Sequence, residues 1–337
     1  MQMKVLITGV TGMVGSYLAE EYLSRGWEVH GTYRYRSDIS NISHIWDKLH
    51  MHLCELKDES NVYDMISTVL PDRIHHLAAS SFVRTSWAEP WAVFENNVKP
   101  SINIFESILK INNYSRYSNK KILKYNPPVH TALSSEELGN PPAEFFPMTE
   151  RNPLLGESPY AVSKIAADQI GYCYFKSYGI NSIQLLCFNM SAPRRGEAFV
   201  CSNFSSQVAK IECGLQEPII RVGNTQTIRD FTDTRDAIQG MILATEKCEA
   251  GRRYVMTAEN HVKIQDIINR LLEITTYNGK IDVVVDSNKL RPSDVMELRG
   301  QATLFKETTG WQPQYDFIKN TIPDLLNYWR TKHEQNR

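Results

Sequence analysis

The stretch KVLITGVTGMVGSYLAEEYLSRG, residues 4–26, decides the fold of this 337-residue chain. Lys4–Thr8 is an apolar run typical of a buried strand, and Val14–Ser24 has the apolar spacing of a helix. Between them lie three glycines spaced three residues apart: Gly9, Gly12 and Gly15. A glycine-rich turn from a strand into a helix lets the backbone approach a pyrophosphate, which the first N–H groups of the helix bind. The alternative is a tight turn with close helix packing and no ligand.

Strand-like and helix-like segments continue to alternate through the first half of the chain. Further strands are predicted at Glu28–Tyr33, Arg73–Leu77, Val129–Leu133 and Ile183–Phe188, and helices at Trp91–Lys110 and Pro159–Tyr178. This order predicts an α/β fold with a Rossmann-type, doubly wound parallel sheet. The polar segment 112–128 is predicted to be a surface loop. Beyond Phe188 the alternation is looser, which predicts a smaller mixed α/β substrate-binding lobe.

Composition excludes several classes of protein. The chain is 42% hydrophobic and 22% charged with a net charge of −1, so it has no general field for nucleic acid or an acidic membrane. It has neither a signal-peptide pattern nor an apolar run of about 18 residues, so we expect no membrane-spanning helix. Six scattered cysteines without a C-x-x-C pair indicate reduced, mostly buried thiols in a cytoplasmic protein, with no metal site.

The end of the second strand bears on the cofactor. A carboxylate there would bind the ribose 2′-hydroxyl of NAD, but the sequence is TYRYRSD, residues 32–38, with Arg34 and Arg36. Because guanidinium groups suit a 2′-phosphate, these arginines favour NADP. The alternative is that both lie in a solvated loop or a subunit contact.

A second constellation lies in GESPYAVSKIAAD, residues 156–168. Ser158 is a plausible N-cap and Pro159 a plausible first helical residue. Tyr160 and Lys164 then share one helix face, and a neighbouring ammonium lowers the pKa of a phenol. Such a tyrosine works as an acid or base near neutral pH. By itself, a Tyr-x-x-x-Lys spacing is common and usually marks two side chains that interact on the protein surface.

A serine and glutamate cluster follows the strand at Val129–Leu133. Ser134 and Glu137 have the spacing of a capping box, but Gly139-Asn140-Pro141-Pro142 would end a helix almost at once. We therefore expect no cap here. The cluster is predicted to place Ser134 at the edge of the cofactor.

Taken together, these motifs resemble the extended short-chain dehydrogenase/reductase family, in the branch that modifies nucleotide sugars. The resemblance spans nearly the whole chain and is carried by the glycine turn, HLAASSFV (76–83), SSEELG (134–139), SPYAVSK (158–164), FNMSAPRRGEAFV (188–200), VGNTQTIRDFTDTRD (222–236), LRPSDV (290–295) and TGWQP (309–313). The chain is most similar to GDP-mannose 4,6-dehydratases and the related GDP-4-keto-6-deoxymannose reductases. PRRGE favours the dehydratases, whereas EPIIRVGN and RDFTDTRD fit the reductases slightly better.

The resemblance implies four catalytic residues. Ser134 would hydrogen-bond the sugar O4, Tyr160 would move the O4 proton, and Lys164 would also hold the nicotinamide ribose. Glu136 matches the dehydratase glutamate that removes the C5 proton, while Glu137 would face elsewhere or be exposed. The implied reaction converts GDP-mannose to GDP-4-keto-6-deoxymannose by internal hydride transfer from C4 through NADP⁺ to C6, with loss of water. Two alternative functions stay open. One is an NADPH-dependent GDP-4-keto-6-deoxymannose 4-reductase, and the other is a dehydratase or epimerase of another NDP-sugar.

The resemblance also implies binding residues. The NADP contacts would come from Gly9, Thr11, Gly12, Met13, Val14, Gly15, Arg34, Arg36, Leu77, Ala78 and Ala79, with Tyr160 and Lys164. The GDP-sugar contacts would come from Ser81, Asn189, Arg195, Val200, Gly223, Arg229, Arg291 and Asp294. An ion pair with Asp230, Asp233 or Asp236 is the structural alternative for Arg229.

The predicted organisation follows from these assignments. Residues 1–188 with about 226–258 would form the NADP-binding domain, and residues 189–225 with about 259–337 the nucleotide-sugar-binding lobe. Relatives pair through helices, so a homodimer or homotetramer is expected. Three residues depart from the family pattern: Met190, Leu138 in an expected active-site wall, and Pro100 in the helix after Asn97.

Overall fold

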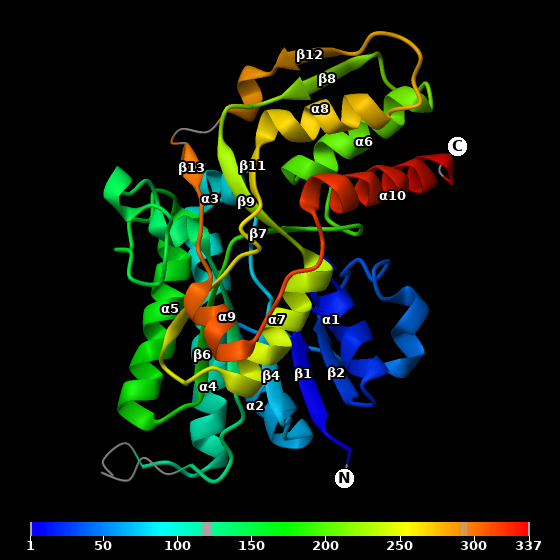
Figure 1. Ribbon diagram of the computed structural model, residues 1–337. Helices are drawn as coiled ribbons and strands as arrows, with labels where there is room; N and C mark the ends of the chain where they lie inside the picture. The colour runs from blue at the N-terminus through cyan, green and yellow to red at the C-terminus, as the bar shows by residue number, and fades with distance from the viewer. Residues whose placement is uncertain (1, 116–122, 291–292, 294, 336–337) are drawn as a thin grey trace.

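Seven parallel strands form the central sheet of the computed structural model, which describes residues 2–115, 123–290, 293 and 295–335 (Figure 1). Along the sheet the order is β10-β6-β5-β4-β1-β2-β3. The strands are β1 (Lys4–Thr8), β2 (Glu28–Tyr33), β3 (His50–Leu53), β4 (Arg73–His76), β5 (Val129–Ser134), β6 (Ser182–Cys187) and β10 (Arg253–Met256). All five predicted strands lie in this sheet with ends within one residue of the prediction, which confirms the doubly wound α/β fold.

Helices cover both faces of this sheet (Figure 1). One face carries α2 (Glu59–Val69), α4 (Pro90–Ile111) and α5 (Pro159–Tyr178), with the short α3 (Val83–Ala88) beside α4. The other carries α1 (Met13–Ser24), α7 (Thr234–Lys247) and α9 (Thr303–Thr309), with a 3₁₀ helix at Ser43–Lys48. Strand β1 shows why two layers form. Its alternating side chains send Leu6 toward Phe105 on one face and Val5 and Ile7 toward Ile242 on the other.

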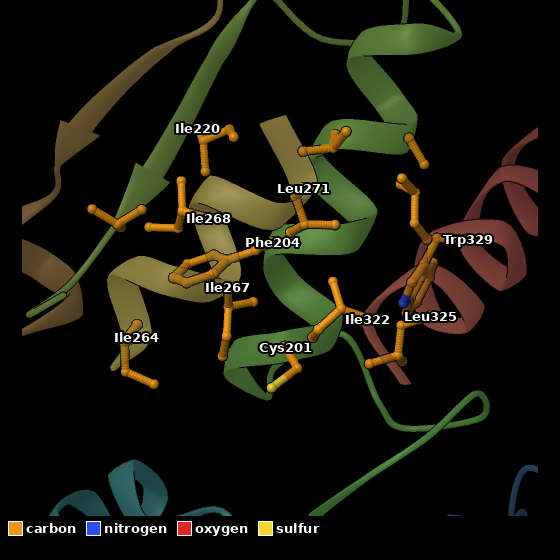
Figure 2. Close-up of a cluster of buried hydrophobic side chains, with 14 of the residues drawn as sticks. Cys201, Phe204, Ile220, Ile264, Ile267, Ile268, Leu271, Ile322, Leu325 and Trp329 are labelled. Atoms are coloured by element: carbon orange, nitrogen blue, oxygen red, sulfur yellow. The ribbon is translucent and has the colours of Figure 1, made fainter. Parts of the chain in front are cut away.

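A second lobe lies above the carboxyl edge of the sheet (Figure 1). It contains β7 (Asn189–Ser191), α6 (Val200–Glu212), β8 (Ile219–Val222), β9 (Ile228–Asp233), β11 (His261–Lys263), α8 (Ile264–Ile274), β12 (Asp282–Val285), β13 (Glu297–Leu298) and α10 (Ile322–Glu334). Strand β9 pairs with β7, β11 and β13, and β8 pairs with β12. Figure 2 shows the lobe's core, where Phe204 of α6, Ile268 of α8 and Trp329 of α10 converge. Burying side chains of this size stabilises a lobe by about 1.5–3 kcal/mol each.

The chain passes between the lobes more than once. Within the predicted segment 226–258, β9 lies in the second lobe, whereas α7 and β10 pack on the central sheet. Because this segment contributes to both lobes, the domain bounds given from the sequence stay a prediction. Residues 112–115 and 123–128 contain no helix or strand, as predicted for a surface loop, and 116–122 lie outside the described residues. No helix in the described part of the chain is long and apolar enough to cross a membrane.

Candidate active site

A cavity of about 820 Å³ opens along the carboxyl edge of the central sheet and extends under the second lobe. It lies where β1 and β4 are neighbours and their following helices go to opposite faces, the position at which doubly wound sheets bind ligands. The cavity brings together most of the predicted site residues: Gly9, Thr11, Gly12, Met13, Val14, Gly15, Arg34, Leu77, Ala78, Ala79, Ser81, Ser134, Glu136, Tyr160, Lys164, Asn189, Arg195, Val200, Gly223 and Arg229.

Three predicted site residues are not placed there. Arg36 is exposed with φ +64° and its guanidinium carbon lies 5.3 Å from the ring centroid of Tyr35, outside the cavity lining. The cavity lining therefore does not support Arg36 as a cofactor contact. Arg291 and Asp294 lie outside the described residues.

The glycine turn places backbone, rather than side chains, against the cavity. Gly9 has φ +71°, and Gly12 is the N-cap of α1. A Cβ on Gly15 would lie 2.4 Å from the carbonyl oxygen of Gly9, so no side chain fits there. The first turn of α1 has no acidic residue to occupy its free N–H groups. The helix N-terminus therefore presents its partial positive charge to the cavity.

The serine and glutamate cluster proves to be a cap, contrary to the prediction. Residues Ser135–Leu138 form a 3₁₀ helix whose N-cap is Ser134. The Ser134 hydroxyl accepts a hydrogen bond from the backbone N–H of Glu136 at 3.3 Å, and Oε1 of Glu137 accepts one from the N–H of Ser134 at 2.9 Å. The prediction was wrong because a one-turn helix ends before the Gly-Asn-Pro-Pro segment begins.

The two glutamates of this turn face in different directions. Glu136 lines the cavity together with Ser134. Glu137 faces away from the cavity, as predicted, but it is fully buried in the core rather than exposed. Burial raises the pKa of its carboxyl group to about 8.

Helix α5 carries the tyrosine and lysine, and its start is built as predicted. The Ser158 hydroxyl accepts from the N–H of Ala161 at 3.1 Å, and Pro159 is the first helical residue. Lys164 is buried, and its Nζ donates to the carbonyl oxygen of Ala132 on β5 at 2.7 Å. The Nζ of Lys164 also lies 6.0 Å from the ring centroid of Tyr160.

The charges around the tyrosine differ from the prediction. The pKa of Tyr160 is raised, not lowered, because burial disfavours the phenolate and the carboxylates of Glu136 and Glu137 oppose its charge. A hydrogen bond with Ser134 and the charge of Arg195 act in the other direction. Burial also lowers the pKa of Lys164 to about 8. Ser134 and Arg195 are thus the groups that favour the phenolate.

Two adjacent arginines join the site to the rest of the molecule. Arg195 lies over the ring of Phe199 at 3.4 Å, and burial lowers its pKa to about 10. Arg194 has φ +75° and points to α1, where it donates to the Ser16 hydroxyl at 3.2 Å and pairs with Glu20 at 2.8 Å. Arg195 therefore lines the cavity and its charge acts on Tyr160, while Arg194 connects the same loop to α1.

Comparison with known proteins agrees with this geometry. The family model for GDP-mannose 4,6 dehydratase matches residues 6–321. GDP-mannose 4,6 dehydratase 1 of Arabidopsis thaliana is 31% identical over 324 residues, covering 93% of this chain and 86% of that protein. GDP-mannose 4,6-dehydratase of Yersinia enterocolitica is 31% identical over 346 residues, covering 92% and 90%.

The chain belongs to the GDP-mannose 4,6-dehydratase family.

Solved structures show that this family member has the fold of the extended short-chain dehydrogenases. RMD from Pseudomonas aeruginosa, solved with NADPH, aligns with a TM-score of 0.80 and 23% identity over 98% of this chain and 100% of its own. The dTDP-glucose 4,6-dehydratase of Bacillus anthracis, solved with NAD, aligns with a TM-score of 0.80 and 19% identity over 99% and 98%. At these identities the likeness establishes the fold alone.

The structure does not favour an ion pair of Arg229 with the nearby aspartates, which was the alternative to substrate binding. Asp230 lies 3.3 Å from His261, and Asp233 pairs with Arg235 at 2.7 Å. The carboxylate of Asp236 accepts from the backbone N–H groups of Gln314 and Tyr315. Each of the three aspartates thus has another partner, while Arg229 lines the cavity.

Sequence reasoning missed several cations of the cavity: Lys57, Arg84 and Lys289. The Nζ of Lys289 donates to Oδ1 of Asn203 at 2.9 Å and to the carbonyl oxygen of Arg221 at 2.7 Å. Arg84 directly follows HLAASSFV, and Lys289 directly precedes LRPSDV. Extending each quoted motif by one residue would have found both.

The three departures from the family pattern lie in different environments. Leu138 is fully buried in a hydrophobic cluster and does not line the cavity, so the expected change to an active-site wall is wrong. Met190 and Pro100 both line the cavity, and Pro100 lies inside α4 rather than in its first turn. Among the described residues, no group of three or more His, Cys, Asp or Glu could hold a metal ion.

Proposed function

We propose that this protein is a GDP-mannose 4,6-dehydratase that uses NADP, with Ser134, Glu136, Tyr160 and Lys164 as its catalytic residues. The observation that carries the proposal is that a carboxylate, Glu136, lines the same cavity as Ser134 and Tyr160. A reductase needs only the serine, tyrosine and lysine, whereas a dehydratase also needs a base for the C5 proton. Membership of the dehydratase family supports the same activity.

The residues around the glycine turn fit a nicotinamide dinucleotide. The close approach of Gly15 to Gly9 and the free N–H groups of α1 leave room and charge for a pyrophosphate. When bound, the dinucleotide would accept hydride from the sugar C4 and return it to C6. Arg34 directly follows β2 and lines the cavity, and its guanidinium suits the extra phosphate of NADP.

Tyr160 would take the proton from the sugar O4 as hydride leaves C4. The Ser134 hydroxyl interacts with the phenol and would hydrogen-bond the same sugar oxygen. The positive charge of Arg195 favours the phenolate form, and the ammonium of Lys164 would hold the nicotinamide ribose beside it. The sugar loses one proton from O4 at the start and gains one proton at C5 at the end, so the number of protons is conserved.

Glu136 would remove the C5 proton once C4 is a ketone. A 4-keto group acidifies the neighbouring C–H bond, so a carboxylate is a sufficient base. The same carboxyl group would then give that proton to the C6 hydroxyl, which leaves as water. The reaction therefore consumes no outside reductant.

The second lobe would bind the GDP part of the substrate. Its cavity lining includes Asn189, Arg195, Val200, Gly223 and Arg229. Two guanidinium groups suit the oxygens of a pyrophosphate. We assign the central sheet to the dinucleotide and the second lobe to the sugar nucleotide.

The test is to incubate the purified protein with GDP-mannose and a catalytic amount of NADP⁺, and to identify the product by NMR. The expected product is GDP-4-keto-6-deoxymannose, formed without consumption of reductant. If no 4-keto sugar forms, the proposal is wrong. Stoichiometric NADPH oxidation with the 4-keto sugar would then identify a reductase, and turnover of another NDP-sugar would change the substrate.

A further inference from the structure

The cavity continues into the second lobe, where α6 and β8 lie on the side away from the central sheet (Figure 1). Its lining there includes Asn203 of α6, Gly223 directly after β8, and Lys289 at the end of the 3₁₀ helix Ser287–Lys289. A Cβ on Gly223 would lie 3.0 Å from the carbonyl oxygen of Lys289, so these two segments are in contact. The proposed mechanism assigns no role to Asn203 or Lys289.

Lys289 brings a positive charge into this part of the cavity. Its Nζ donates to Oδ1 of Asn203 at 2.9 Å and to the carbonyl oxygen of Arg221 at 2.7 Å. Both acceptors are neutral, so neither cancels the charge of the ammonium group. An ammonium group has three protons, and these two bonds leave one N–H for a ligand.

Gln207 of α6 fixes the orientation of the Asn203 amide. Oε1 of Gln207 accepts a hydrogen bond from the backbone N–H of Arg221 at 2.8 Å, so its other amide atom, Nε2, is a donor. Nε2 donates to Oδ1 of Asn203 at 2.9 Å and to the carbonyl oxygen of Arg221 at 3.0 Å. Reversing the Asn203 amide would place its NH₂ group against two donors, Gln207 and Lys289. The oxygen of Asn203 therefore faces these residues, and its nitrogen faces the other way.

The amide nitrogen of Asn203 is a donor that the protein itself does not use. Nδ2 forms no hydrogen bond within the described part of the chain, although the residue lines the cavity. Both acceptor sites of its Oδ1 are already occupied by Lys289 and Gln207. Donors removed from bulk water need an acceptor. Asn203 and Lys289 thus offer a ligand N–H groups and no acceptor.

The position of these donors indicates which part of a sugar nucleotide would meet them. In the proposed function the sugar lies beside Tyr160 at the central sheet, and guanidinium groups of the second lobe hold the diphosphate. The base is at the other end of the diphosphate and therefore reaches farther into the second lobe. Val200, Phe204 and Ile264 also line the cavity in this lobe and offer apolar surface to a planar ring.

Purine bases differ in what they present to such donors. Guanine has two adjacent acceptors, O6 and N7, whereas adenine has an amino donor at position 6 beside N7. An adenine amino group that faces Nδ2 of Asn203 would leave donors without acceptors, which disfavours binding.

We propose that Asn203 and Lys289 are specificity-determining residues that select guanine by donating hydrogen bonds to its O6 and N7 atoms. Gln207 is a positioning residue, because it fixes the Asn203 amide but does not line the cavity. The inference rests on the proposed function, since GDP enters only as part of the proposed substrate.

The first test compares nucleoside diphosphates on the wild type by titration calorimetry. Inosine diphosphate keeps O6 and N7 but lacks the 2-amino group of guanine, whereas ADP has an amino group in place of O6. We expect inosine diphosphate to bind within about threefold of GDP, and ADP to bind about 10–100-fold more weakly than GDP. If ADP binds as tightly as GDP, or inosine diphosphate as weakly as ADP, the proposal is overturned.

Asn203→Asp tests the amide directly. The aspartate keeps an oxygen for Lys289 and Gln207 but replaces the cavity-facing donor with an acceptor. The ratio of GDP affinity to ADP affinity should fall about tenfold or more, because the acceptor repels O6 and suits the adenine amino group. A merely structural role would weaken both nucleotides and leave this ratio unchanged.

Asn269→Asp is the matched control. Asn269 is exposed on α8 in the same lobe, its Oδ1 accepts from Nε2 of Gln265 at 3.1 Å, and it does not line the cavity. This variant adds the same negative charge to the lobe and should leave the affinity ratio at the wild-type value. An equal fall in both variants would contradict the proposal.

Lys289→Met provides a second variant that is independent of the amide. It should weaken GDP and inosine diphosphate about tenfold while NADP affinity stays. If the wild type selects guanine but Asn203→Asp and Lys289→Met both retain the wild-type affinities, these residues are not the selectors and the proposed dehydratase function still stands. If the wild type binds UDP more tightly than GDP, the proposed substrate is wrong and this inference fails with it.

Discussion

The two halves of the cavity are built from different parts of the chain. The half that we assign to the cofactor is built around backbone: Gly9, Gly12 and Gly15 bend the chain within seven residues at the start of α1. The half that we assign to the substrate has long side chains, such as Arg195 and Arg229, that different segments of the second lobe supply. A backbone site tolerates few substitutions but needs little sequence, whereas a side-chain site needs the whole fold to converge.

This difference predicts which substitutions should abolish ligand binding in each half of the cavity. A turn without side chains fails when a side chain is added, because no rotamer relieves a clash with the backbone. A cluster of cations fails by degrees, because each arginine supplies one share of the phosphate binding. The proposed catalytic residues also line this cavity, and loss of the Tyr160 hydroxyl alone should leave most of both proposed binding sites intact.

The largest expected effect concerns Tyr160. Tyr160→Phe removes the hydroxyl that moves the O4 proton, so kcat should fall about 10²–10⁴-fold. Titration calorimetry should show NADP and GDP still binding with near wild-type affinity. If binding of either nucleotide is lost as well, the role of Tyr160 is not confined to catalysis.

In the substrate half, Arg229→Met should weaken GDP binding about 10–100-fold, because a charge-assisted hydrogen bond contributes about 1.5–3 kcal/mol. NADP affinity should not change. Arg221→Met is the matched control, since Arg221 is exposed and pairs with Glu217 four residues away. Equal losses in the two variants would mean that general charge, rather than position, drives binding.

In the cofactor half, Gly15→Ala would place a Cβ 2.4 Å from the carbonyl oxygen of Gly9. The required backbone shift costs about 1–3 kcal/mol and should weaken NADP binding roughly tenfold while GDP binding stays. Gly26→Ala is the control, because Gly26 also has a special conformation, φ +76°, but no atom lies within 4 Å of its Cβ position. It should lower stability without altering NADP affinity.

The smallest expected effect concerns the choice between NADP and NAD. Arg34→Ser removes the cavity-lining guanidinium and should reduce the preference for NADP over NAD about threefold to fivefold, measured as the ratio of kcat/KM values with the two cofactors. Arg36→Ser should change nothing, because Arg36 lies outside the cavity lining. An equal change in both variants would contradict the placement of Arg36.

The same contrast explains what the sequence could predict. Strands β1 and β2 and the turn after β1 depend on local patterns, and each was predicted to within a residue or two. The different environments of Glu136 and Glu137 could not be predicted, because a 3₁₀ helix turns about 120° per residue and sends adjacent side chains in different directions. Predicting which one faces the core requires knowing that α5 and β6 cover that side.

The substrate half was predicted only where a family motif named its residues. Arg84 and Lys289 lie 205 positions apart in the sequence and meet only in the folded cavity. No local periodicity marks either residue as a ligand. The raised pKa of Tyr160 was missed for a related reason, since burial is a property of the assembled fold and not of the Tyr-x-x-x-Lys spacing.

The position of β10 in the central sheet sets the order in which the molecule can be assembled. Its residues 253–256 pair with β6, at residues 184–187, and Arg253 closes onto Asp168 beside them. Until that late segment is synthesised, the outer edge of β6 has unpaired backbone groups that can associate with other chains. Completion of the catalytic edge is therefore a long-range step, and such steps are slow and expose nascent chains to aggregation.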